Sequence, residues 1–527
     1  MNVNDLLYPC LTVSLKPKAF KAWFLPIFSL GLLAACVLFF VFCIDFSEKK
    51  LFGPGELSRY FDFAPESVSN SIGVLSSIVA AVLGIVITVV SIVVQLAATR
   101  YTAAVSDIFL KDKKNRWTIG FYIVSCIVGL WVAFAVQDTW VPRTGLVLML
   151  VLATFCFLLM PPYFNHVFKL LSPKAIVKTI ENAVDQVLFK QKNIAVHKKQ
   201  IAVMEQIETL CDIAINSVAQ KDRIIAIETV DTLSRVTTSY IERREELSRA
   251  WFSEKEALHK NPDFSSLDPA FLERLRTKHT WFEFKVFRQY QTIYNEALGN
   301  MSIVNYEIAI QLRKNAEKAA STKNGKHILG IAIKFFNTFL RTTINNKDIR
   351  TTYTILNQYR SLAIFLLRND HGDLTLNMAN YMKYYGHVAH EKKLGFITEI
   401  VAYDIGEICE KAHQLAHPIE KPLLETFLEV DPCHVQDRIQ EKALQGVRKA
   451  QIKLASYYLV HDDETKARAI WKDMHNENQT RLESIKKELL SVNIKEFWEI
   501  SERSEDFDFL QDSQKTKMEE FFTWFNF

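Results

Sequence analysis

Apolar residues form a long run from Gly73 to Ala98, after which the chain turns polar with no glycine or proline to end a helix. A helix needs roughly 20 apolar residues to cross a bilayer, so this run predicts a membrane span. Small and polar residues recur within it at alternating steps of four and three, which places them on one helical face. We therefore expect one aliphatic face and one small or polar face. The latter comprises Ser77, Ala81, Gly84, Thr88, Ser91, Gln95, Ala98 and Thr102.

Three more runs are long and apolar enough to cross a bilayer, so the pattern predicts four spans. Lysine and arginine gather before the first span, between the second and third, and after the fourth, which predicts that both termini are cytoplasmic. The central part of each span lacks Asp, Glu, Lys and Arg, which disfavours a proton-coupled transporter. The expected spans cover about 22–44, 73–98, 117–136 and 145–167.

The chain from Lys174 onward shows apolar residues at threes and fours and no alternating, strand-like runs. The predicted fold is therefore all-α: an N-terminal four-helix transmembrane domain followed by a large cytoplasmic domain of helical hairpins, similar to tetratricopeptide repeats. Lys221-Asp222 and Lys347-Asp348 stand at corresponding turns of two similar segments, although any helix–turn–helix with an aspartate cap gives such a pattern.

Four regions are expected along the chain. They are a transmembrane domain (1–170), a linker helix with a helical hairpin (171–250), a cytoplasmic α-helical domain (251–495) and an aromatic and acidic C-terminal segment (496–527).

Charge is distributed unevenly between these regions. Residues 1–170 hold 13 Lys or Arg and 9 Asp or Glu, whereas the rest of the 527-residue chain holds 50 of each. Nucleic-acid binding usually needs a concentrated basic patch, so the balanced charge gives it no support. The eight cysteines include no CxxC pair, and several lie in apolar spans, which favours reduced, buried thiols over disulfides or a zinc site.

Known catalytic motifs are missing from the sequence: it has no phosphate-binding loop, dinucleotide fingerprint, nucleophile elbow or zinc-protease helix. Two histidine pairs, His387 with His390 and His413 with His417, have spacings that suit a metal, but no cysteine or further motif supports them. Asp222 and Asp231 are read as a helix cap and a residue of a solvated face. We expect no enzyme activity, no cofactor and no metal.

The stretch 87–129 resembles a bacterial four-span family of predicted membrane proteins classed as a domain of unknown function. In that family a polar-striped second span continues into a shared motif, and a third span then opens with a glycine. The resemblance implies a multi-pass protein of the bacterial inner membrane and implies no activity. The matching residues here are Gln95, Leu96, Ala97, Tyr101, Thr102, Val105, Phe109, Asp112 and Gly120.

A second stretch, 214–233, resembles a turn of the same family and keeps Ser217, Asp222 and Asp231. It departs from the family where Val218 and Arg223 replace residues that tend to be proline. The whole resemblance covers about residues 20–235.

Two functions agree with these patterns. The first is a membrane-anchored scaffold or sensor that binds a protein partner through its cytoplasmic hairpins or its C-terminal segment. The alternative is a homo-oligomeric, channel-like pore lined by the second span, with a basic ring at its cytoplasmic mouth. The same residues would also suit a packing seam, because small residues let helices approach closely. The candidate pore or packing residues are Ser77, Gly84, Thr88, Ser91, Gln95, Arg100 and Thr102.

Overall fold

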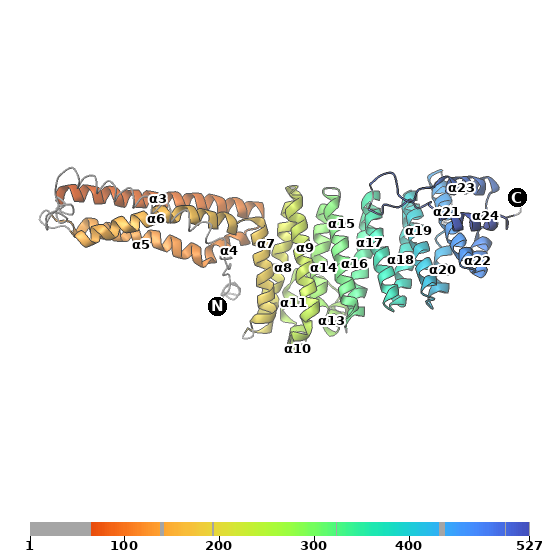
Figure 1. Cartoon of the computed structure of the whole chain (residues 1–527). Helices are drawn as coiled ribbons and strands as arrows, with labels where there is room; N and C mark the ends of the chain where they lie inside the picture. The colour runs from red at the N-terminus through yellow and green to blue at the C-terminus, as the bar shows by residue number, and fades with distance from the viewer. Residues whose placement is uncertain are drawn as a thin grey trace. The chain divides into compact units, whose positions relative to one another are not determined.

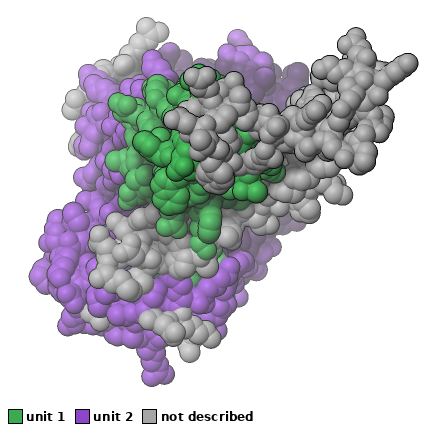
Figure 2. Space-filling view, turned by 90° about the vertical axis from the view of Figure 1, so that its left-hand side faces the viewer, with its two compact units in different colours: residues 1–187 green, residues 188–527 purple. Residues whose placement is uncertain are grey.

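The structure is a computed structural model in which every regular element described is a helix, as the sequence predicts. The chain divides into two compact units, residues 1–187 and residues 188–527 (Figure 2). The first predicted span, 22–44, lies outside the described residues. The structure describes residues 65–137, 142–191, 194–253, 255–322, 324–431, 438–500 and 502–525.

Among its described residues, the first unit contains three helices that are long and apolar enough to cross a membrane: α3, α5 and α6. They correspond to the second, third and fourth predicted spans, and each contacts the other two. The count of four spans is not confirmed by the described residues. The helices of this unit are α3 (Pro65–Arg100), α4 (Ala104–Lys111), α5 (Lys113–Ala135), α6 (Arg143–Leu170) and α7 (Pro173–Asp185).

The three long helices meet closely at Gly129 of α5. A Cβ atom at this position would lie 2.6 Å from Cε of Met149 and 2.7 Å from Oγ of Ser76, so only glycine leaves room for both neighbours. Nearby, the Tyr122 hydroxyl donates a hydrogen bond to the carbonyl oxygen of Cys156 at 2.7 Å, which ties α5 to α6. Large apolar side chains such as Phe134 point outward, as a lipid-facing surface requires.

The second unit is a solenoid of antiparallel helical hairpins (Figure 1). Its helices form two rows. Row A contains α8, α14, α16, α18 and α20, row B contains α9, α15, α17, α19 and α21, and each helix contacts the next one in its row. Each hairpin therefore buries its apolar side against its neighbours, as in other solenoids. The assignment to tetratricopeptide repeats stays a prediction.

The helices of row A are α8 (Val196–Ala219), α14 (Trp281–Ala297), α16 (Gly325–Asn345), α18 (Gly372–Glu391) and α20 (Glu420–Leu428). Those of row B are α9 (Arg223–Arg243), α15 (Ser302–Ala320), α17 (Ile349–Arg368), α19 (Gly395–Gln414) and α21 (Arg438–Val460). The chain ends with α22 (Glu464–Met474), α23 (Gln479–Ser491) and α24 (Asp512–Phe522).

The solenoid turns repeat one local geometry. A helix ends, one residue adopts positive φ, and the next residue donates its N–H to a carbonyl five positions back. This 6→1 bond satisfies a carbonyl that the helix end would leave without a donor. In three turns an aspartate then caps the next helix through its carboxylate. These three pairs are Lys221-Asp222, Lys347-Asp348 and Asp462-Asp463.

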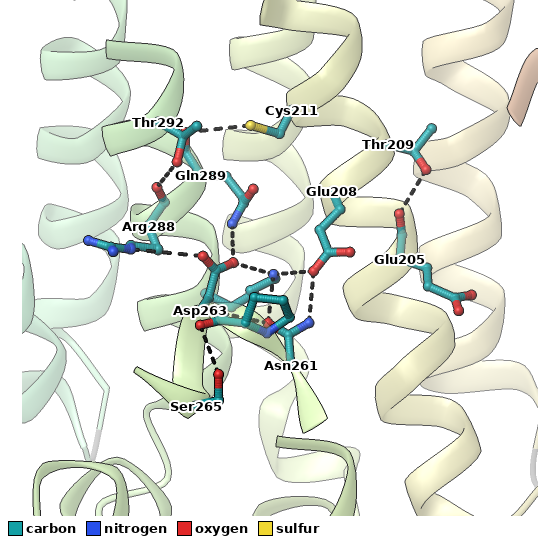
Figure 3. A network of polar contacts seen from close by, with 12 residues as sticks. Glu205, Glu208, Thr209, Cys211, Asn261, Asp263, Ser265, Arg288, Gln289 and Thr292 are labelled. Atoms are coloured by element: carbon teal, nitrogen blue, oxygen red, sulfur yellow. Dashed lines mark hydrogen bonds and ion pairs between the residues drawn. The ribbon is translucent and has the colours of Figure 1, made fainter. Parts of the chain in front are cut away.

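A buried lysine fixes α12, one of four short α-helices between α9 and α14, to the solenoid. The side chain of Lys285 on α14 is fully buried, and its ammonium pairs with Glu208 of α8 and Asp263 of α12. Figure 3 shows Glu208, Asn261 and Asp263 converging on this point. Gln289, one turn further along α14, donates to the same Asp263 carboxylate at 2.6 Å. The short helices are α10 (Arg249–Ser253), α11 (Glu256–Lys260), α12 (Pro262–Ser265) and α13 (Pro269–Thr277).

Candidate functional site

Helix α3 has the two faces that the sequence predicts. Part of its aliphatic surface packs on α5 and α6, and Val79 and Val86 are fully buried there. Most of the predicted small and polar residues lie on the opposite side and are exposed, whereas Ala98 and Thr102 are half-buried. This side, here called the polar face of α3, therefore does not pack on α5 or α6. It comprises Ser77, Gly84, Thr88, Ser91 and Gln95.

Two hydroxyl groups on the polar face of α3 donate hydrogen bonds within the helix itself. Ser77 donates to the carbonyl oxygen of Gly73, and Thr88 to that of Gly84, each at 2.8 Å. A Cβ atom at Gly84 would meet nothing within 4 Å, so this glycine is not needed for contacts within the described residues. Such a face can lie against another helix, because these two hydroxyls are already paired and its residues are mostly small.

Polar side chains are buried together at the end of α3 that carries the basic loop. Asp112 caps α5 by accepting from the Asn115 N–H at 2.8 Å, and its carboxylate also lies 2.9 Å from Nε2 of His166. Tyr163 donates to the side-chain oxygen of Asn115. Burial would raise the pKa of Asp112, but these hydrogen bonds outweigh it and hold the pKa below its usual value. Of these residues the sequence singled out only Asp112, through the family motif.

The two remaining residues of the predicted pore or packing set lie at the end of α3 that leads into the basic loop. Arg100 is exposed in the last turn of α3, and Thr102 is half-buried in the turn between α3 and α4. Both therefore lie at the end of the span rather than along its length.

The family-like turn of the second unit has mainly structural roles. Ser217 is buried and donates to the carbonyl oxygen of Ile213, and Asp222 caps α9. Asp231 does not lie on a simple solvated face. The side-chain amide of Gln311 donates to the carboxylates of both Asp231 and Glu307. Burial and the neighbouring Glu307 raise the pKa of Asp231 to about 6.

The histidine pairs are occupied by protein partners. His387 on α18 contacts the carbonyl oxygen of Glu429 at 3.0 Å. His413 of the second pair lies on another helix, α19. The ring of His413 lies 2.7 Å from Glu420, and Asp463 lies close by, so the three form a cluster with metal-ligand spacing. The ammonium of Lys466 already pairs with both carboxylates. The protein's own cation thus offsets one of the two negative charges of this cluster.

The C-terminal segment docks on the solenoid. Between α23 and α24 the dark blue trace runs back over α19 towards α17 (Figure 1). Arg503 pairs with the buried Asp404 of α19, and Asp508 accepts from Lys449 of α21 at 2.7 Å. The structure thus shows that this part of the segment docks on its own domain.

Comparison with known proteins addresses the first unit. Residues 20–209 match the family described as Predicted membrane protein (DUF2254). The match confirms the resemblance drawn from the second span, and in the described part of the chain it covers α3 to α7 and the first half of α8. It ends before Ser217, Asp222 and Asp231, so the family-like turn lies outside it. Comparison with curated proteins and with solved structures finds no match.

Proposed function

We propose that this chain is a membrane-anchored scaffold or sensor, held in the bacterial inner membrane by its apolar helices and binding a protein partner on its cytoplasmic solenoid. One observation carries the proposal. Apolar side chains are exposed at the starts of row B helices: Ile224 on α9, Ile349 on α17 and Phe396 on α19. Because row B helices lie side by side, these starts line one edge of the solenoid. Proteins use such apolar edges for partner binding.

Site-specific photo-crosslinking tests this proposal. A photoreactive amino acid placed at Ile224, Ile349 or Phe396 of the full chain in cells is expected to give a discrete adduct with one partner at all three positions. Arg368 and Gln414, the last residues of α17 and α19, are exposed on the opposite edge and serve as matched controls. Equal labelling at both edges, or no adduct at any position, would contradict a partner-binding edge.

The polar face of α3 favours a second function, a homo-oligomeric, channel-like pore. This face is left open by α5 and α6, and a shallow, open surface cavity lies beside its Ser77 end. In the pore, Thr88, Ser91 and Gln95 of several copies would surround an axis, with Arg100 at the mouth. The cavity is lined by Asn70, Gly73, Val74, Ser77, Ile78 and Ala81.

Size and conductance measurements test the pore. The purified protein is expected to be oligomeric in detergent and to conduct in planar bilayers, and Gln95→Leu should reduce the conductance severalfold. Ile85→Leu, on the exposed aliphatic surface of the same helix, is the control and should conduct like wild type. A monomer, or wild-type protein without conductance, would exclude the pore and leave the scaffold proposal untouched.

A further inference from the structure

The segment from Arg503 to Asp508, here called the strap, crosses three neighbouring helices of row B. Its arginine pairs with both carboxylate oxygens of Asp404 on α19, and the ring of Phe507 lies 5.1 Å from that of Tyr403 on the same helix. The strap continues to α21, where Lys453 donates to the carbonyl oxygen of Phe507 at 2.7 Å. The surface formed by these helices therefore binds one arginine and, four residues later, one aromatic ring.

Further contacts hold the strap at the two outer helices, α17 and α21. At α17 the guanidinium of Arg503 lies over the ring of Tyr353, 4.7 Å from its centroid. At α21 the carboxylate of Asp508 accepts from Lys449, and it also accepts from the hydroxyl of Tyr403. Side chains supply most of these contacts, which is how solenoid surfaces recognise extended peptides.

The fit of the strap is incomplete. The Nε–H groups of Arg503 and Arg360 are both buried without an acceptor, and Nε of Arg360 stays 3.8 Å from the Asp404 carboxylate that the two arginines share. A buried donor without an acceptor costs free energy, so the docking of the strap is weaker than that of a fully paired contact. The strap also places Asp508 near the buried carboxyl of Glu399, which adds like-charge repulsion. Both features oppose docking of the strap, so its release would leave the surface open to another peptide.

We propose that the α17–α19–α21 surface is a peptide-binding site that the strap occupies in cis. Its ligand is an extended segment of a partner protein with an arginine followed, four and five residues later, by an aromatic residue and an acid. The acid matches Lys449 and Lys453, and the arginine matches Asp404, so a uniformly basic or uniformly acidic peptide is excluded by charge. This inference rests on the proposed scaffold function and names its partner class.

A labelled peptide with the chain's own sequence from Glu502 to Leu510 is the probe. In wild-type protein the tethered strap has a high effective concentration, so the free peptide is expected to bind weakly. In the full-length double variant Arg503→Ser/Phe507→Ala the strap loses its anchors, and peptide affinity measured by fluorescence anisotropy should rise at least tenfold. The control variant Glu502→Ser changes an exposed neighbour and should behave like wild type.

The specificity of binding is tested on both partners. A peptide carrying the same two substitutions should not bind the double variant, and Tyr353→Ala in the double variant should weaken binding of the unmodified peptide severalfold. If the double variant keeps its helical circular dichroism and thermal melt but takes up no peptide, the strap is a fixed part of the fold and the inference is wrong. Concentration-dependent dimerisation of wild type that Arg503→Ser abolishes would assign the site to a second copy, and would equally overturn a foreign ligand.

Hydrogen exchange on wild-type protein tests displacement of the strap by the peptide, and it does not depend on whether the double variant folds. Excess peptide should speed exchange of the strap amides while the amides of α19 stay protected. Unchanged exchange at saturating peptide would contradict displacement. Crosslinking at the row B edge together with failed peptide binding would leave the scaffold function standing and remove only this inference.

Discussion

Buried charges in the helical unit are matched by partners that lie far away in the sequence. Lys285 pairs with Glu208 and Asp263, and Arg503 pairs with Asp404. Removing one partner of such a pair leaves a charge in a poorly hydrated site, which usually costs more than the pair itself contributes. At the residue scale, the strap is thus tied to the solenoid mainly by Asp404.

Folding changes the pKa of Glu399 on α19, which makes a pH-dependent test of its burial possible. Its carboxyl fits beside Gly446 of α21, where a Cβ atom would lie only 2.4 Å from it. Burial, then Asp508 and Glu488, raise the pKa of Glu399 to about 7 against the opposing effect of Lys449. The folded state therefore keeps a proton that the unfolded state loses above about pH 4.5.

This difference predicts that stability falls as pH rises from about 4.5 to 7, since the folded state binds more protons there. Glu399→Gln keeps the site neutral, so we expect the variant to be more stable than wild type at pH 8, by up to about 3 kcal/mol, and similar at pH 4.5. Unfolding of the full chain in detergent measures this. Glu391→Gln, an exposed position at the end of α18, is the control. A variant with the wild-type pH slope would contradict the assignment.

At the scale of single elements, the solenoid turns are set by their capping aspartates. Asp348 accepts from the Thr351 N–H at 2.9 Å and from its hydroxyl at 2.7 Å, whereas Asp222 accepts from the Ile225 N–H at 3.4 Å. We expect Asp348→Ala to lower the unfolding free energy by about 1 kcal/mol, and Asp222→Ala to cost clearly less. Thermal unfolding of the two variants in parallel checks the order. A larger loss for Asp222→Ala would show that hydrogen-bond geometry does not control these caps.

The sequence predicted those elements whose signals are local. The alternation of steps along α3 identified its two faces, and the Lys-Asp pairs located two turns before helices with the same geometry. Periodicity cannot say which face packs, and here the aliphatic face, not the small and polar one, contacts α5 and α6. Contacts such as Arg503 with Asp404 join positions 99 residues apart, so no local pattern reveals them. The docking site of the strap could therefore be found only in the structure.

At the scale of the whole molecule, the two units have different surfaces. In the described part of the first unit, α3, α5 and α6 expose many large aliphatic and aromatic side chains, among them Trp131 and Phe134. The second unit buries many of its large aromatics, including Trp281, Tyr290 and Phe336, between its own helices. Lipid or detergent is thus needed for the first unit, whereas the core of the second is complete within the solenoid.

Residues 188–527 expressed alone are therefore expected to fold without detergent. Their far-ultraviolet circular dichroism should be strongly helical, and they should melt cooperatively, because each hairpin finds its neighbours within the fragment. Trp281→Ala in the same fragment removes a fully buried side chain that contacts Trp251, and should lower the unfolding free energy by about 3–5 kcal/mol. Residues 1–187 should aggregate unless detergent is present. Aggregation of residues 188–527 in plain buffer would show that the solenoid depends on the membrane unit for its stability.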